Sequence, residues 1–246
     1  MVADFSSFIL GSSITIFASA SLCLNIAVLW TLWRHKFLTN QHDGIFILAF
    51  ANMSGNAFAL FVYGAYLGPM AITQSYLFSS LYPFPKFIGA AWHVQWYQDM
   101  LLMAFTAINR WIVVVKPPYL PVFTRTHTMF FIIFAYSAGI FITILATYVL
   151  PCCMLYFEYV SMSFAYFVDG PNDTDHFLDY PVNVTCMTVA VLCYIRIYFF
   201  VRSSNIKIMS NLPKSAAENR KAKETKYAFQ FAACTFCVIG FSEYEL

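Results

Sequence analysis

The chain contains long stretches that hold no charged residue. The first runs from Phe5 to Trp33, over 29 positions without Asp, Glu, Lys or Arg. An α-helix needs about 20 mainly apolar residues to cross the hydrocarbon core of a bilayer. A secretory signal peptide has a shorter apolar region preceded by basic residues, whereas no basic residue precedes this longer stretch. We therefore interpret it as a membrane span that is retained.

Five further apolar stretches follow the first. We expect six membrane spans in a single domain, at about residues 6–33, 44–68, 87–109, 128–150, 181–201 and 227–242. Helix-breaking residues mark two of the ends, Gly68-Pro69 after the second span and Pro151 after the fourth. The composition agrees, because 60% of the residues are hydrophobic and 11% are charged, against about 25% charged in a soluble domain. The sequence predicts an all-α membrane protein.

Basic residues indicate how the chain is oriented in the membrane. Of the 14 Lys and Arg residues, all but Lys86 follow the first, third or fifth span. Loops rich in Lys and Arg stay in the cytoplasm, so we expect these loops to be cytosolic and the N-terminus to be outside. The formal net charge is only +2. This argues against a nucleic-acid-binding protein, whose affinity depends on neutralising phosphates.

The segment between the fourth and fifth spans has the character of an extracellular loop. Residues 151–180 contain five Asp or Glu residues and no Lys or Arg. Asn172-Asp173-Thr174 lies in this loop, and Asn183-Val184-Thr185 follows at the mouth of the fifth span. Both match the N-glycosylation acceptor pattern, which is typical of exposed segments outside the cytosol. We expect Asn172 and Asn183 to be glycosylated.

The third span holds an acidic residue within the membrane. Charged groups are costly there and are treated as functional by default, and Asp99 is nearly alone in this respect. We expect a ligand or ion pocket that combines this span with the second one, formed by Trp92, Gln95, Trp96, Asp99 and Asn52. Two other interpretations remain open. In the first, Asp99 is a carboxyl with a structural role only. In the second, the tryptophans belong to the aromatic belt at the membrane surface.

Short motifs in three spans resemble those of seven-helix G-protein-coupled receptors. Asn109-Arg110-Trp111, with Lys116-Pro117 after it, resembles the inner end of their third helix. The segments 24–29, around Asn25, and 48–52, ending in Asn52, resemble the motifs of their first and second helices. Within this superfamily the chain is most similar to nematode serpentine chemoreceptors of class x, Srx, through Tyr97, Pro151-Cys152-Cys153 and Lys223-Glu224. The resemblance implies a rhodopsin-like helix bundle.

The resemblance also implies roles for individual residues. A heterotrimeric G protein would contact Asn109, Arg110, Trp111, Lys116 and Pro117, while Asn25 and Asn52 would pack helices together. A guanidinium keeps its proton at the membrane edge and needs a partner, such as backbone carbonyls of an intracellular protein. The alternative is that Arg110 is one more basic anchor on the cytosolic side. The basic segment 203–226 has the same two interpretations, G-protein contact or attraction to anionic lipid.

The chain departs from the family pattern in two ways. The usual disulfide of the family begins at the outer end of the third helix, but Pro85 stands 25 residues before Arg110 and no cysteine is near it. Cys152 and Cys153 therefore either bond Cys186 or remain thiols. The six expected spans are also one fewer than the seven helices of the family. We expect a fragment or truncated isoform without the seventh helix, or a sixth segment that does not cross.

These features together predict a chemosensory G-protein-coupled receptor in a multi-pass membrane location, the plasma membrane or a sensory cilium. A small lipophilic molecule would bind from outside, and a helix rearrangement would reach the G protein, without cofactor or metal. Two alternatives are a truncated receptor that does not signal and a small-solute transporter, which would normally carry several intramembrane charges. Enzyme motifs such as His-Glu-x-x-His and Gly-x-Ser-x-Gly are absent from the sequence.

Overall fold

The computed structural model describes residues 5–38, 44–77, 84–115, 124–150, 154–159, 161–167 and 172–209. Five helical segments within these ranges are long and apolar enough to cross a membrane: Phe5–Arg34, Phe46–Thr73, Phe84–Val115, Arg125–Val149 and Asp175–Ser204. The predicted all-α membrane fold is confirmed. The predicted sixth span, 227–242, lies outside the described residues.

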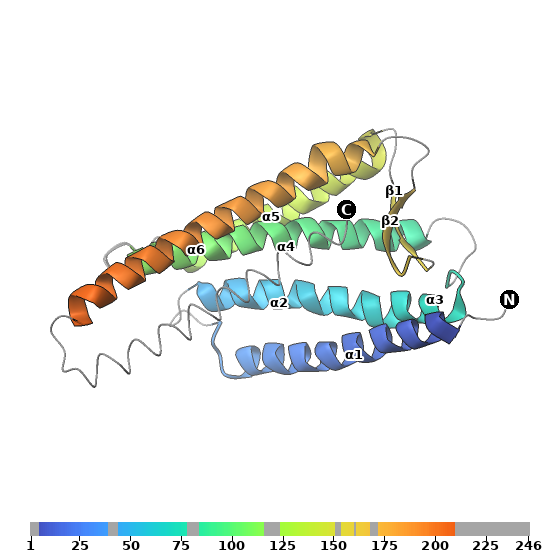
Figure 1. Cartoon of the computed structure of the whole chain (residues 1–246), viewed down its shortest axis with the longest axis horizontal. Helices are drawn as coiled ribbons and strands as arrows, with labels where there is room; N and C mark the ends of the chain where they lie inside the picture. The colour runs from blue at the N-terminus through green and yellow to red at the C-terminus, as the bar shows by residue number, and fades with distance from the viewer. Residues whose placement is uncertain are drawn as a thin grey trace.

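The helices form two layers (Figure 1). One layer holds α1 (Phe5–Arg34), α2 (Ile45–Val62) and α3 (Gly68–Thr73), and the other holds α4 (Phe84–Val115), α5 (Arg125–Ile144) and α6 (Tyr180–Met209). Helix α4 is central, because it packs on α5 and α6 in its own layer and on α2 in the other. Any movement of α4 therefore affects helices of both layers.

A short β-hairpin closes one end of the bundle. Strands β1 (Met154–Glu158) and β2 (Ser163–Phe167) pair antiparallel, with Phe157 opposite Phe164. The hairpin lies over the beginning of α4, next to α3 (Figure 1). We call this the hairpin end, and the opposite end, where Arg110 lies near the last turn of α4, the Arg110 end. The sequence analysis treated this segment only as an acidic loop and missed the strands.

Three π-helical turns lie near the hairpin end: the first joins α2 to α3, the second ends α5 and the third precedes α6. They are η1 (Tyr63–Leu67), η2 (Leu145–Val149) and η3 (Asp175–Asp179). The second span was predicted to end at about Gly68-Pro69, yet the helix continues to Thr73. Turn η1 explains the difference: the Gly68 N–H donates to the carbonyl of Tyr63, and Pro69 then sits in the first turn of α3, where its missing N–H is tolerated.

Two other helices are longer than expected. The third span was predicted at 87–109, but α4 begins at Phe84 and ends at Val115, and α6 continues past residue 201 to Met209. The prediction stopped near charged residues such as Lys86 and Arg110. A charged residue does not have to end a membrane helix. The long apolar part of a Lys or Arg side chain can lie along the helix while its charged group reaches water.

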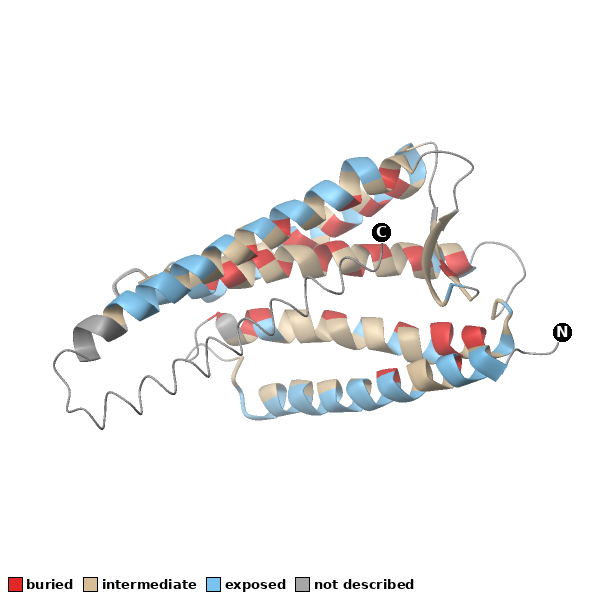
Figure 2. Ribbon diagram, in the orientation of Figure 1, coloured by how far each residue is buried: buried red, intermediate tan, exposed pale blue. Residues whose placement is uncertain are grey.

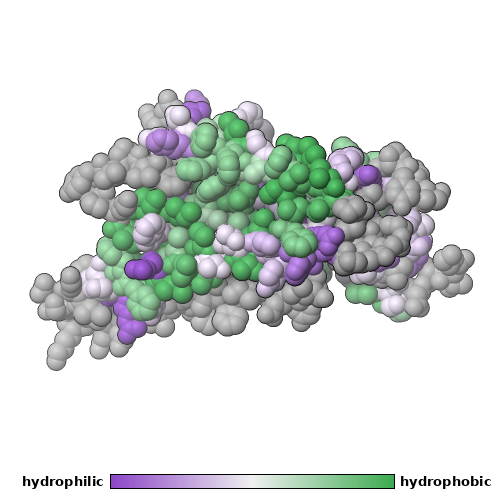
Figure 3. Space-filling view, turned by 90° about the horizontal axis from the view of Figure 1, so that it is seen from above, coloured by the Kyte–Doolittle hydropathy of each residue, from purple (hydrophilic) through white to green (hydrophobic). Residues whose placement is uncertain are grey.

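The outward faces of the helices are apolar. Phe17 on α1 is 74% exposed and Phe141 on α5 is 62% exposed. Buried residues lie on the sides of the helices that face their neighbours, as Figure 2 shows. Hydrophobic side chains cover most of the described surface on the face drawn in Figure 3. An apolar surface of this extent is typical of a protein in contact with lipid.

Five hydroxyl groups within the spans are satisfied by their own helices. Thr15, Ser54 and Thr106 each donate a hydrogen bond to the carbonyl four residues earlier, over 2.9, 2.8 and 2.7 Å. Ser13 and Thr31 do the same on α1, both over 2.8 Å. Because hydrocarbon offers no partner to a hydroxyl, this pattern lets polar residues occupy membrane helices without an unpaired donor.

Candidate functional site

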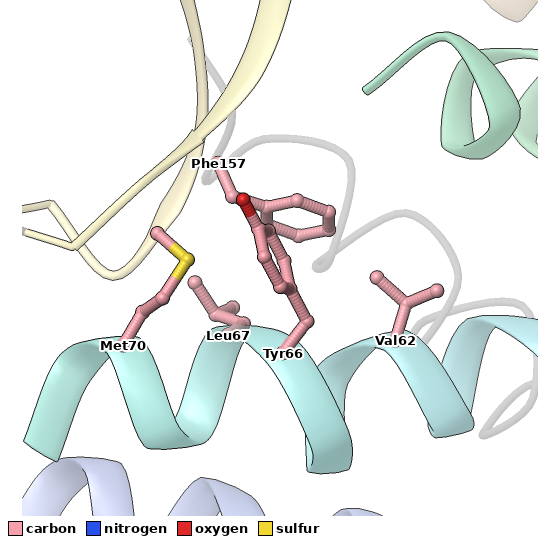
Figure 4. Close-up of a cluster of buried hydrophobic side chains, with 5 residues drawn as sticks. All are labelled: Val62, Tyr66, Leu67, Met70 and Phe157. Atoms are coloured by element: carbon pink, nitrogen blue, oxygen red, sulfur yellow. The ribbon is translucent and has the colours of Figure 1, made fainter. Parts of the chain in front are cut away.

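Aromatic side chains gather beneath the hairpin. The Trp92 ring on α4 stacks on Phe164 of β2, with ring centroids 4.2 Å apart, and meets Tyr63 of η1 edge-on at 4.9 Å. Phe157 of β1 is fully buried against Tyr66, and Figure 4 shows it reaching down onto the helix face that carries Val62, Leu67 and Met70. We call Tyr63, Tyr66, Trp92, Phe157 and Phe164 the aromatic cluster.

A polar cluster lies beside the aromatic one. Asp179, at the end of η3, accepts hydrogen bonds from the hydroxyls of Tyr97 on α4 and Tyr166 on β2. The Nε2 atom of His93 lies 3.1 Å from the same carboxylate. Asp179 is 8% exposed, and His93 and Tyr97 are buried as well. This Asp179 cluster therefore joins α4, the hairpin and the start of α6 through one buried carboxylate.

Two buried glutamines form a third feature on α4. The Gln95 side chain lies against Gly55 of α2, where a Cβ atom would collide with its amide. Gln98, one turn further along, is fully buried, and neither atom of its amide has a hydrogen-bond partner among the described residues. Among the described residues, Gln95 Nε2 and Asn52 Oδ1 are also buried without a partner. Buried amides normally form hydrogen bonds, so these unpaired atoms are exceptions.

The residues predicted to form a ligand pocket lie in different local environments on α4 and α2. Trp92 belongs to the aromatic cluster, while Trp96 contacts the rings of His93 and Tyr97 in the Asp179 cluster. Asp99 is half-buried about two turns from Trp92. The structure records no hydrogen bond between Asp99 and Asn52, the polar neighbour that the sequence suggested, although both residues are described.

The Arg110 end presents a different surface. Asn109 is 2% exposed, and its Oδ1 atom has no partner within the described part of the chain. Arg110 is exposed, Trp111 is half-buried, and no ion pair is recorded between Arg110 and a described residue. Lys116 and Pro117 lie outside the described residues. Among the described residues, therefore, none forms an ion pair with the exposed guanidinium on this side of the bundle.

Comparison with known proteins identifies the family. The family model described as "Serpentine type 7TM GPCR chemoreceptor Srx" matches residues 13–241 of this chain. The chain belongs to this Srx family of chemoreceptors. No match was found among proteins with curated descriptions. Among solved structures, squid rhodopsin is similar with a TM-score of 0.69 at 14% sequence identity, over 98% of this chain and 65% of the rhodopsin chain.

These findings confirm the Srx resemblance and the rhodopsin-like helix bundle. Srx proteins are receptors rather than enzymes. The Srx chain covers 65% of the squid rhodopsin chain. At 14% sequence identity, this similarity shows a shared fold. The described residues contain no group of three or more His, Cys, Asp or Glu that could hold a metal ion.

The sequence analysis missed the centre of the Asp179 cluster. It used Tyr97 only for the family resemblance and counted Asp179 only as one acidic residue of a loop. A signal was present, because His93 and Tyr97 stand four residues apart and therefore share a face of α4. Nothing local to Asp179, however, shows that it reaches residues 82 and 86 positions away.

Of the two states left open for the cysteines, the structure shows Cys186 as a free thiol, buried within α6. Cys152 and Cys153 lie outside the described residues. The fifth span was predicted to begin at about residue 181, but helical structure already begins with η3 at Asp175. Cys186 therefore lies about three turns inside the helical segment.

The two glycosylation motifs lie in different settings. Asn172 stands just before η3, and its Oδ1 atom accepts a hydrogen bond of 3.1 Å from the Asp175 N–H. It therefore caps the first helical turn. Asn183 lies within α6, inside the segment that could cross the membrane. Of the two, only Asn172 lies outside the segment that could cross the membrane.

Proposed function

We propose that this chain is a chemosensory receptor that binds a small molecule at the hairpin end and transmits a helix rearrangement to a heterotrimeric G protein at the Arg110 end. The observation that carries the proposal is that one helix bears both surfaces. Trp92, Trp96 and Asp99 lie toward the hairpin end of α4, and the exposed Arg110 lies about 16 Å from Asp99 along the same helix. Membership of the Srx family supports both roles.

The charges support an orientation with the hairpin end outside. Arg34, Arg125 and Arg202 lie on the segments that reach the Arg110 end, whereas Glu158 and Asp173 lie at the hairpin end. Basic residues favour the cytosolic side of a membrane. We propose a multi-pass protein of the plasma membrane or a sensory cilium, with its N-terminus outside and lipid bilayer around the five described helices.

Glycosylation tests this orientation. Glycosidase treatment of the cell-expressed chain should increase its gel mobility, and Thr174→Ala should abolish that shift because it removes the first acceptor motif. Thr174→Ala leaves Asn172 in place as the cap of η3. Asn183→Gln, the matched control, should leave the shift intact because Asn183 lies inside α6. If the wild-type chain is in the membrane and shows no shift, the orientation is wrong.

The chemistry of the hairpin end favours a small lipophilic ligand with some polarity. The aromatic cluster offers apolar ring surface, and Gln95, Gln98 and Asp99 add polar groups deeper along α4. A pocket that is mainly apolar with a few convergent polar groups is typical of sites for small molecules. An ion bound by Asp99 and Asn52 is part of the same proposal, because a carboxylate and an amide oxygen are suitable ligands for a hard cation.

Asp99→Asn should alter the ligand response or its dependence on sodium. The substitution keeps the shape of the side chain but removes the charge, so a bound cation or cationic group loses its main attraction. We expect the half-maximal ligand concentration to change about tenfold or the effect of sodium to disappear. Asp173→Asn, which removes a carboxylate at the hairpin end while preserving the acceptor motif, should leave the dose curve unchanged. An unaffected curve for Asp99→Asn would favour a structural carboxyl.

The receptor function itself is tested by nucleotide exchange. Membranes that contain the chain and purified heterotrimeric G proteins of several classes would be exposed to a panel of small lipophilic molecules. At least one molecule should accelerate binding of a non-hydrolysable GTP analogue, and membranes without the chain should not respond. If the chain is folded in the membrane and no molecule stimulates exchange with any G protein, the proposed coupling is overturned.

A further inference from the structure

The two strands of the hairpin do not by themselves provide enough stability to keep it folded and in place. An isolated two-stranded hairpin is marginally stable in water, and it needs packing against another element to persist. Here β1 packs on the beginning of α4, and Gly89 permits the approach because a Cβ atom there would collide with the carbonyl of Leu155. Phe157 and Phe164 fill the space above Trp92. The hairpin thus covers the part of α4 that carries the aromatic cluster.

Packing of aromatic rings alone allows the hairpin to slide or lift, because apolar contacts are not directional. The directional contact comes from β2. The Tyr166 hydroxyl donates to one oxygen of Asp179, while Tyr97 donates to the other oxygen and His93 approaches that same atom. Hydrogen bonds to an ionised carboxylate are among the stronger ones in proteins, and they fix geometry.

We propose that Asp179 is a positioning residue that clasps the hairpin, through Tyr166, in the closed position over the aromatic cluster. Because α4 supplies His93 and Tyr97 to the same carboxylate, the clasp fixes the hairpin relative to α4 as well as to the start of α6. This goes beyond the proposed receptor function, since it concerns the position of the hairpin whether or not the chain couples to a G protein.

Hydrogen exchange of the full chain in lipid nanodiscs tests the clasp. Tyr166→Phe removes one hydroxyl and keeps the ring, so it should release the hairpin without disturbing its apolar contacts. We expect the amides of 154–159 and 161–167 to exchange about tenfold faster, since a released hairpin loses most of its own stability. Amides of α1, which has no contact with the Asp179 cluster, should be unchanged and so show that the bundle remains folded.

Two control variants make the result specific. Tyr159→Phe removes a hydroxyl from the same hairpin, at a ring that packs on Tyr76 rather than on the Asp179 cluster, and it should leave exchange unchanged. Gly89→Ala displaces β1 sterically without touching the clasp, so it should accelerate exchange and show that the method detects a displaced hairpin.

A double variant separates a clasp from independent structural effects. Asp179→Ala should accelerate hairpin exchange at least as much as Tyr166→Phe, because it removes the acceptor of the Tyr166 hydroxyl together with the contacts to His93 and Tyr97. Adding Tyr166→Phe to Asp179→Ala should have little further effect, since both changes remove one shared interaction. If Asp179→Ala does not fold, Tyr166→Phe alone decides. Exchange in Tyr166→Phe equal to that in Tyr159→Phe, while Gly89→Ala is accelerated, would overturn the proposal.

Discussion

Arg110→Ala should abolish ligand-stimulated nucleotide exchange on a G protein while leaving the amount of chain in the membrane unchanged. Arg110 is exposed near the last turn of α4, and the structure records no ion pair with another described residue. Its five N–H donors are therefore available to backbone carbonyls of a protein that docks at this end. We expect stimulated exchange to fall by a factor of ten or more.

Two further variants decide between coupling and simple anchoring. Arg110→Lys keeps the charge but loses the planar fork of donors, so it should restore only part of the exchange. Arg34→Ala removes an exposed guanidinium from the same end of the bundle, at the last turn of α1. If Arg110 is only a basic anchor, Arg34→Ala and Arg110→Ala will have equal effects on exchange and on membrane insertion.

Gly139→Val should strongly destabilise the fold. A Cβ atom at Gly139 on α5 would lie 2.9 Å from the carbonyl oxygen of Val94 on α4, so the backbones of the two helices would have to separate. Overpacking of this kind costs up to about 3 kcal/mol, which for a chain of this size lowers the unfolding temperature by roughly 6 to 12 °C. Thermal unfolding of the detergent-solubilised chain would measure the change.

Gly64→Val is the matched control for that experiment. A Cβ atom at Gly64 would lie 3.3 Å from the Ser19 hydroxyl, a side-chain atom that can move, rather than against a backbone. We therefore expect a much smaller loss of stability. Equal losses for Gly64→Val and Gly139→Val would show that the close approach of α4 and α5 is not a special requirement of the fold.

The membrane helices could be predicted from the sequence because hydropathy is a local property. An apolar run of sufficient length must form a helix in lipid, whatever the rest of the chain does. The ends were less accurate. The π-turn before Pro69 and the helical turn that begins at Asp175 depend on backbone hydrogen bonds that no composition window contains.

The hairpin end could not be predicted in the same way. The segments Met154–Glu158 and Ser163–Phe167 pack as strands because Phe157 and Phe164 contact Trp92, which is more than 60 positions earlier in the chain. Asp179 is buried for the same reason, since its partners His93 and Tyr97 come from α4 and Tyr166 comes from β2. Local patterns identified the right helix, α4, but not the distant residues that complete its environment.

The buried amides of Gln95 and Gln98 bear on how such a bundle could tell molecules of equal size apart. A molecule that carries its own hydrogen-bonding atoms can satisfy these groups, whereas a pure hydrocarbon of the same volume leaves them unpaired. A site that contains unpaired amides strongly rejects a ligand that lacks the matching hydrogen-bonding groups. An apolar cavity discriminates between similar ligands much less. Discrimination in this chain would then depend on the pattern of heteroatoms in a small-molecule ligand more than on its bulk.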